Sequence, residues 1–285
     1  MKFSQPNGEL WMPDGADEQD TLGRVTHMAI AAHQDDVEIM ALDGILAGLG
    51  NRGFMAVIAT NGAGSPRAGR YENYGDEQMQ LIRRLEQKKA AFVGEYSAVA
   101  FLDHSSAAVK DGGDPVSKDD LKNILTVCRP QIIYTHNLAD KHDTHIAVAL
   151  RTIAAIRELP EDRHPKKLYG CEVWRDLDWL VDSDKVIFNL GKLENIAASL
   201  VGVFDSQIAG GKRYDLATMG RRRAHATYLQ SHAVDAAESV DFGMDLTPLI
   251  HNSQLDPAEY VGTLIQRFAD DVSRKIGCFS FPKPS

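Results

Sequence analysis

Short apolar runs alternate with longer amphipathic stretches through the first half of this chain. The runs are short and lack proline, so they are predicted strands; they lie at 25–32, 54–60, 98–102 and 131–135. The stretches between them have helical spacing and are predicted helices, at 37–49, 75–95, 118–128 and 143–159. In the helix at 75–95, one predicted face carries Met79, Ile82, Leu85, Lys89 and Phe92. Strands that alternate with helices of ten or more residues predict βαβ units and a mainly parallel sheet with helices on both faces, an α/β fold.

The pattern is weaker in the second half. It predicts strands at 168–174 and 185–190 and helices at 192–204, 213–230 and 257–275. No linker rich in proline and serine separates the halves, and no repeat is evident. We therefore expect a single domain over residues 1–285, in which a half at about 165–285 caps or completes a half at about 25–160.

Composition narrows the class of protein. The chain has 285 residues, of which 44% are hydrophobic and 25% charged, as in ordinary globular proteins with a full core. Its formal net charge of −9 argues against a nucleic-acid groove or an anionic membrane surface as the main partner. The one dense basic cluster, Arg221 to Arg223, is expected to be a solvated helix face.

The lack of a recognisable targeting signal and the spacing of the cysteines lead us to expect a cytoplasmic protein. The amino terminus is polar and acidic, so we expect no secretory signal, and no apolar run approaches membrane-spanning length, so we expect no membrane insertion. Cys128, Cys171 and Cys278 are far apart and predict neither a disulfide framework nor a zinc ribbon. The sequence leaves the oligomeric state open, with a homo-oligomer as one alternative.

Two charged clusters follow predicted strands. The first, His33-Gln34-Asp35-Asp36-Val37-Glu38, lies between the strand at 25–32 and the next helix. The second follows the strand at 131–135 and holds three of the ten histidines, His136, His142 and His145. Ligands bind at the carboxyl ends of strands in open α/β sheets, and both clusters lie at such ends. Burying these charges without partners is costly, so a divalent metal is the simplest explanation for both clusters.

Two histidines and one aspartate from separate segments suit a catalytic zinc, which usually has three protein ligands and one open position for water. Bound zinc lowers the pKa of that water toward about 7. The reaction then needs a base for the water proton and a donor for the developing oxyanion. Asp35 lies beside the proposed ligand Asp36, and His142 lies three residues before the proposed ligand His145, so both are spare for these roles.

These motifs, Ala32-His33-Gln34-Asp35-Asp36 and Asp140-Lys141-His142-Asp143-Thr144-His145, resemble those of the LmbE/PIG-L family of zinc-dependent N-acetylglucosaminyl deacetylases and related amide hydrolases. Weaker matches, which include Arg83-Arg84-Leu85-Glu86 and Ser206-Gln207, extend the resemblance over about residues 25–210, and the Val37-Glu38 continuation is similar to a bacterial subgroup. The resemblance implies a Rossmann-like three-layer sandwich. It also implies removal of an acetyl group from an N-acetylated sugar or sugar conjugate.

The resemblance also implies roles for individual residues. His33, Asp36 and His145 match the zinc ligands, Asp35 the general base and His142 the acid or oxyanion stabiliser. Arg70 and Asp103 match positions that contact the sugar in some members.

Two further residues have open alternatives. Glu38 is either an outer partner of the metal site or a first-turn acid that the helix dipole favours, and His136 either lines the site or only forms part of the turn. Iron or another divalent metal could replace zinc, because ligand type does not fix the choice.

The sequence departs from the family pattern at two positions. Gln34 stands where many members have proline. Thr144 stands where the common form of the second motif has an aspartate that supports the first histidine, here His142. We expect Asp140 to supply that carboxylate instead.

Three other functions compete with deacetylation of a sugar. An amidase of a thiol conjugate or other amide would use the same metal site. A non-catalytic metal-binding regulatory protein would result if the change at Thr144 disabled His142. A nucleotide-sugar transferase that holds a metal diphosphate on Asp35 and Asp36 is disfavoured by the second histidine cluster.

Overall fold

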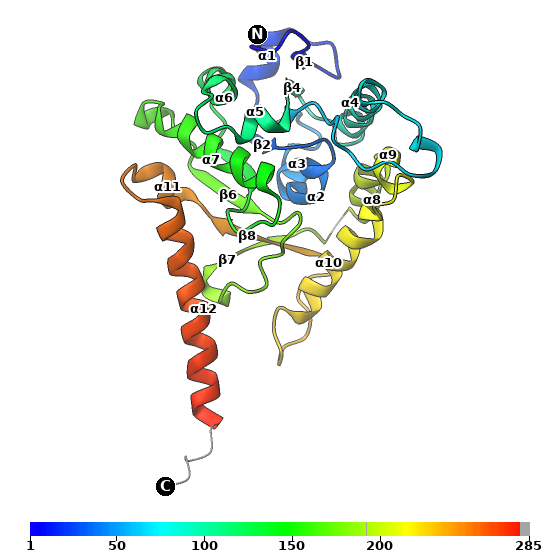
Figure 1. Ribbon diagram of the computed structural model, residues 1–285. Coiled ribbons are helices and arrows are strands. Elements are labelled where there is room, and N and C mark those ends of the chain that lie inside the picture. The colour runs from blue at the N-terminus through cyan, green and yellow to red at the C-terminus, as the bar shows by residue number, and fades with distance from the viewer. Residues whose placement is uncertain (192, 280–285) are drawn as a thin grey trace.

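The computed structural model describes residues 1–191 and 193–279, whose strands form one mixed sheet (Figure 1). Across the sheet the order is β1 (Glu9–Trp11), β4 (Ala98–His104), β3 (Phe54–Thr60), β2 (His27–Ala31), β5 (Ile132–His136), β6 (Lys167–Cys171), β8 (Val240–Asp245) and β7 (Lys185–Asn189). The five strands from β4 to β6 are parallel, whereas β1 and β8 run antiparallel to their neighbours. The predicted α/β class with a mainly parallel sheet is confirmed.

Helices cover both faces of this sheet. They are α1 (Glu18–Gly23), α2 (Asp36–Met40), α3 (Leu42–Gly48), α4 (Asp76–Val93), α5 (Ser106–Lys110), α6 (Val116–Cys128), α7 (Asp143–Arg157), α8 (Glu194–Gly202), α9 (Asp205–Ile208), α10 (Tyr214–Tyr228), α11 (Thr247–His251) and α12 (Pro257–Phe279). Side chains of α1, α6, α7 and α11 pack in one core cluster, and those of α2, α3, α4 and α8 in the other. The result is a three-layer sandwich with β2 at its centre.

The order of the strands determines where a ligand can bind. The chain runs from β2 to β3 and β4 on one side, and then crosses back so that β5 lies on the other side of β2. Loops that leave β2 and β5 therefore diverge and open a crevice at the carboxyl ends of these two strands. Both charged clusters of the sequence follow these strands.

Two of the predicted helices differ from the structure. The helix expected at 37–49 is divided into α2 and α3 at Ala41, whose φ of −123° and ψ of 28° are not helical. The predicted apolar face of α4 is wrong, because Leu85 and Phe92 are exposed. The face of α4 that turns inward holds Met79 and Ala90 together with three polar side chains, Arg83, Glu86 and Gln87.

Close approach of α3 to the sheet depends on one glycine. A Cβ on Gly44 would lie 2.5 Å from Cε2 of Tyr134, so only glycine fits without a shift. The neighbouring Asp43 accepts a hydrogen bond of 2.6 Å from the Tyr134 hydroxyl. These contacts bind α3 directly to β5.

In the second half, the predicted strands and helices correspond to β6, β7, α8, α10 and α12. Residue 192, the expected start of the helix at 192–204, lies outside the described residues. The strands β1 and β8 and the short helices α1, α5, α9 and α11 are additions that the pattern did not predict.

The basic cluster of α10 is only partly solvated. Arg222 is fully buried, and its Nε lies 2.9 Å from a carboxylate oxygen of Asp241 on β8. Its Nη2 donates to the carbonyls of Glu38 and Ile39 in α2, so this side chain joins three elements. Arg223 is exposed as expected and pairs with Glu194. Within the described chain, we find no helix with the length and apolar character needed to cross a membrane.

Candidate metal and catalytic site

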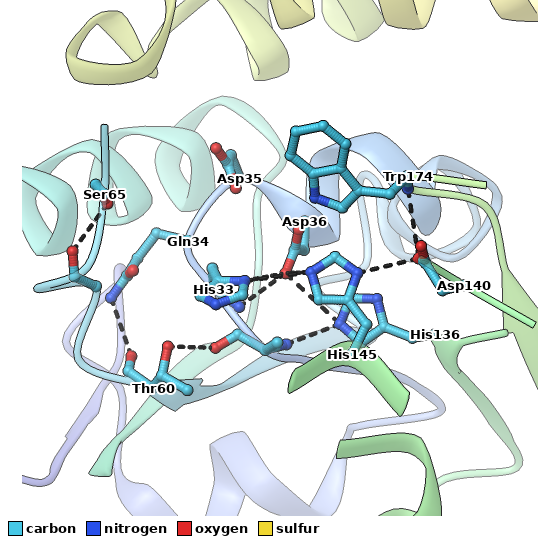
Figure 2. A network of polar contacts seen from close by, with 12 residues as sticks. His33, Gln34, Asp35, Asp36, Thr60, Ser65, His136, Asp140, His145 and Trp174 are labelled. Atoms are coloured by element: carbon cyan, nitrogen blue, oxygen red, sulfur yellow. Dashed lines mark hydrogen bonds and ion pairs between the residues drawn. The ribbon is translucent and has the colours of Figure 1, made fainter. Parts of the chain in front are cut away.

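The two charged clusters meet at the carboxyl ends of β2 and β5 (Figure 2). His33 and Asp36 come from the turn between β2 and α2, and His145 from the first turn of α7. The central position of β2 and β5 brings together residues that are 112 positions apart in the chain.

Three donor atoms form a nearly equilateral triangle. His33 Nδ1 lies 3.1 Å from Asp36 Oδ2, and His145 Nε2 lies 3.3 Å from each of these two atoms. Ligands about 2.0–2.1 Å from a tetrahedral zinc lie about 3.3 Å from one another. The three atoms therefore have the spacing expected of three protein ligands that would hold one zinc ion, and two of these residues, His33 and Asp36, line the neighbouring cavity.

Asp140 orients His145. Its Oδ2 lies 3.0 Å from His145 Nδ1 and also accepts a hydrogen bond of 3.3 Å from the Trp174 amide. A carboxylate on one ring nitrogen directs the other toward a metal and raises its basicity. The expectation that Asp140 supports His142 is therefore corrected, because this carboxylate is bonded to the second histidine of the motif and not to the first.

The electrostatics of the triangle favour a cation. Burial by itself would raise the pKa of Asp36, but the neighbouring His145 and His33 hold it well below its usual range. Burial likewise lowers the pKa of His145, yet Asp36 and Asp140 together raise it to about 9. A proton thus occupies this group of donors when no metal is bound, and a divalent cation can replace that proton.

Asp35 projects from the same turn toward the cavity (Figure 2). Its φ of 87° and ψ of −32° form a backbone conformation that L-residues rarely adopt. Its Oδ1 lies 3.2 Å from Nη2 of Arg83, whose guanidinium also donates to the Gln34 carbonyl and the Ser65 hydroxyl. Burial raises the pKa of Asp35 to about 7, against the opposing effect of Arg83. The carboxyl can therefore exchange a proton near neutral pH.

A buried chain of polar groups supports Asp35 from behind. The Asp35 amide donates to Gln87 Oε1 at 3.3 Å, and Gln87 Nε2 donates to Glu38 Oε1 at 2.7 Å. Glu38 also accepts a 2.7 Å bond from the Tyr96 hydroxyl, and burial raises its pKa to about 8. Glu38 thus contacts the site through Gln87 and does not reach the triangle itself.

The other two histidines of the second cluster differ in position. His136 is fully buried and stacks on His145 with ring centroids 3.8 Å apart, while its Nε2 accepts a bond of 2.9 Å from the Ala32 amide. It therefore lies beneath the triangle and does not line the cavity. His142 lines the cavity, with its ring 4.6 Å from that of His145. Burial and the charge of His145 lower the pKa of His142, and its Nδ1 has no hydrogen bond within the described chain.

A cavity of about 300 Å³ opens above the triangle. Several of its lining residues had no assigned role in the sequence: Arg83, Ser106, Lys110, Thr144, Trp174, Gln207 and Tyr214. Arg83 and Gln207 belonged to the weaker family matches, which were the only signal for them. Trp174 is 37% exposed and forms part of the cavity wall. Arg70 and Asp103 do not line this cavity.

Arg70 and Asp103 each pair with another charged side chain. The guanidinium of Arg70 pairs with Asp205, and Asp103 lies 2.9 Å from Nη2 of Arg84. Their predicted contact with a sugar is therefore not supported by their positions in the structure.

Comparison with known proteins agrees with this geometry. Residues 28–156 match the PIG-L family of GlcNAc-PI de-N-acetylases, which confirms the resemblance over a segment that holds the triangle, Asp35 and His142. None of the curated proteins matches the chain at a significant level.

Three solved structures share the fold at low sequence identity. They are the conserved protein TT1542 from Thermus thermophilus (TM-score 0.62, 15% identity, 81% of this chain and 99% of that one), N,N'-diacetylchitobiose deacetylase from Pyrococcus horikoshii (0.61, 14%, 80% and 85%) and the 4-carboxy-2-hydroxymuconate hydratase GalB from Pseudomonas putida (0.58, 16%, 78% and 96%). The fold alone is thus compatible with more than one reaction.

Proposed function

Because residues 28–156 match the PIG-L family, we propose that this protein is a metal-dependent hydrolase that removes an acetyl group from an N-acetylated sugar or sugar conjugate. The observation that carries the proposal is the triangle of His33 Nδ1, Asp36 Oδ2 and His145 Nε2, with edges of 3.1 and 3.3 Å, beside the buried carboxyl of Asp35. One of the three similar structures is a hydratase, whose reaction needs no acetamide carbonyl. The match of residues 28–156 to a family of de-N-acetylases favours deacetylation over hydration.

His33, Asp36 and His145 would hold the metal, with Asp140 fixing the orientation of His145. A set of two imidazoles and one carboxylate suits zinc, and iron is the alternative that the same donors accept. When bound, such a cation supplies a Lewis acid for the acetamide carbonyl and lowers the pKa of a water molecule.

Asp35 takes the proton from the attacking water. It is adjacent to the ligand Asp36 in sequence, faces the cavity and has a pKa of about 7. Its pairing with Arg83 fixes the carboxylate in one orientation, and the buried Gln87 fixes its backbone. A base near neutral pKa both accepts the proton and can return it to the leaving amine.

His142 lines the same cavity as Asp35, and we assign it to the developing oxyanion. Its ring packs against His145 and Trp174, which limits its motion. A ring N–H aimed at the carbonyl oxygen stabilises negative charge that develops there in the transition state. Because His142 contacts the cavity directly, this role does not require the missing aspartate at position 144.

The cavity suits a small polar substrate. Its volume of about 300 Å³ is at the lower end of small-molecule sites, so it fits one sugar ring better than a long chain. Trp174 offers an apolar ring for stacking, and the polar wall holds Ser65, Ser106 and Gln207 for hydroxyl groups. An N-acetylated sugar presents both an apolar ring face and hydroxyls.

The test is acetate release from a panel of N-acetylated sugars, sugar conjugates and amides of thiol conjugates, with zinc supplied. We expect release from sugar acetamides, loss of that release with a chelator, and recovery when zinc is restored. Hydrolysis confined to thiol conjugates would favour the amidase instead. Tightly bound zinc without hydrolysis of any member would favour a non-catalytic metal-binding protein.

A further inference from the structure

Helix α12 extends well beyond the body of the molecule (Figure 1). Its first turns are anchored, because Val261 and Leu264 are buried in the core and Tyr260 donates to the Asp245 carbonyl at 2.6 Å. Arg267 then pairs with Asp184 at 2.7 Å. Beyond Arg267 the helix continues for another twelve residues to Phe279.

An apolar stripe follows the projecting part of this helix. Ile265, Phe268, Val272 and Phe279 recur at spacings of three, four and seven residues, which places them on one face. Their exposed fractions are 51%, 39%, 38% and 85%. The stripe continues the buried face formed by Val261 and Leu264, so it has the character of a packing surface that extends past the body.

We propose that this stripe binds the same stripe of a second copy of the chain, so that two α12 helices pair antiparallel in a homodimer. The four residues expose roughly 450 Å² per copy, so pairing two copies would remove at most about 900 Å² of largely apolar surface from water. Together with the flanking polar residues, that area approaches the about 1,200–2,000 Å² of stable interfaces.

The charges of α12 favour a protein partner over a lipid surface. The helix carries three acidic residues, Glu259, Asp270 and Asp271, and three basic ones, Arg267, Arg274 and Lys275. Helices that bind anionic membranes are rich in lysine and arginine on the polar face. A helix with equal numbers of both charges in a chain of net charge −9 lacks that attraction.

The position of Lys275 selects the antiparallel alignment. It lies three residues after Val272 and seven after Phe268, on the face of the stripe. In a parallel pair in register, Lys275 would meet the same lysine of the second copy. In an antiparallel pair centred on Val272, Ile265 lies opposite Phe279, and Lys275 lies opposite Ala269 of the second copy and away from the other Lys275. Lys275 already pairs with Asp271 of its own helix, at 2.7 Å, so the antiparallel alignment avoids the contact between lysines and leaves this ion pair intact.

The first test measures the mass of the full chain in solution by light scattering coupled to size exclusion. We expect twice the 31.4 kDa of one chain for the wild type, and 31.4 kDa for the double variant Phe268→Glu, Val272→Glu. The matched control is Thr263→Glu, Gly277→Glu, which adds the same charge to the opposite face of α12. At Gly277 a new Cβ meets no described atom within 4 Å, so the control should remain dimeric.

Folding is checked by circular dichroism, since the stripe variant should keep the wild-type helical signal. A monomeric wild type, or a stripe variant that keeps the wild-type mass, would overturn the proposal. A monomeric wild type that sediments with phosphatidylserine vesicles would overturn it in favour of a lipid surface.

The second test reads the alignment by cross-linking. In a Cys278→Ser background, Val272→Cys should form an intermolecular disulfide under mild oxidation, because this position faces itself. The native Cys278 is exposed but lies opposite Gln266 of the second copy in the antiparallel register, so the wild type should not cross-link. Efficient cross-linking through Cys278 would contradict the antiparallel alignment.

Discussion

Asp35 is the residue whose replacement tests the proposed reaction most directly. Asp35→Asn keeps the size of the side chain and an oxygen for the Arg83 guanidinium, but it removes the group that accepts the proton. A positioned general base contributes about 10²–10⁴-fold to the rate, so kcat should fall by that factor, or by about 2.7–5.5 kcal/mol in activation free energy. Asp35 is not one of the three donors of the triangle, so the variant should still bind one equivalent of zinc.

The backbone at Asp35 separates this loss from a structural effect. Its φ of 87° and ψ of −32° are rarely adopted by L-residues; asparagine resembles aspartate in accepting positive φ, whereas alanine should cost about 1–3 kcal/mol there. Asp35→Ala should therefore lose activity to a similar extent and also lose some stability to thermal unfolding. If both variants lose the same activity but only alanine lowers the melting temperature, the catalytic loss belongs to the carboxylate.

Asp103→Asn is the matched control. Asp103 also has a positive φ, of 61°, and also pairs with an arginine, Arg84, but it does not line the cavity. We expect kcat within about twofold of wild type for this variant, because it alters no group that contacts substrate. The assay is acetate release on the best substrate of the panel, with zinc content measured by mass spectrometry. Activity of Asp35→Asn within about tenfold of wild type would refute the assignment of the base.

Three further predictions concern the metal site and the buried carboxyls. His145→Ala should abolish stoichiometric metal binding, which metal analysis of the purified variant would show; full zinc occupancy would contradict the ligand set. Asp140→Asn should weaken zinc binding by about 10–100-fold in a chelator competition, because the support of His145 is lost; an unchanged affinity would exclude that role. Glu172 has a pKa raised to about 8 by burial and by Asp241, against an ordinary value of 4.5. The folded state therefore keeps a proton that the unfolded state releases, and stability should fall as the pH rises from about 4.5 to 8. Urea unfolding with the metal chelated should show a shallower pH dependence for Glu172→Gln than for wild type, and equal slopes would contradict this pKa.

Much of the first half of the fold could be predicted from the sequence, because its strands are buried on both faces. β3 consists of seven buried residues, and a continuous apolar run has few alternatives to a central strand. β8 was missed for the opposite reason. Its sequence, Val-Asp-Phe-Gly-Met-Asp, alternates polar with apolar residues and includes a glycine, and its burial depends on contacts that only the assembled sheet provides.

Burial was also predicted wrongly for α4, where the spacing of apolar residues indicated a buried face that is in fact exposed at Leu85 and Phe92. A buried helix face is usually apolar, but this one lies beside the site and supplies Arg83, Glu86 and Gln87. Glu86 accepts bonds from the amide and hydroxyl of Ser206, at 2.7 and 2.6 Å, which joins α4 to α9. Polarity that serves a site cannot be distinguished from a solvated surface by spacing alone.

The site itself was predictable as two clusters but not as a network. Strand ends in a parallel sheet converge, so the meeting of His33 and His145 follows from topology. The partner of Asp140 does not follow from topology, because a loop of a few residues can present a carboxylate to either of two histidines. In the structure the Trp174 amide, from the segment after β6, fixes Asp140 against His145. Trp174 is 34 residues from Asp140 along the chain, so the spacing of the motif alone could not predict this contact.

The buried polar groups around α2 show why such a short helix can hold a metal ligand in place. α2 has only five residues and would not be stable alone. Arg222 donates to two of its carbonyls from one side, and Glu38 joins it to Gln87 and Tyr96 from the other. Burying Arg222 and Glu38 costs desolvation, which apolar residues would avoid. Their bonds fix the turn that presents Asp35 and Asp36, and that fixed geometry is what electrostatic catalysis requires.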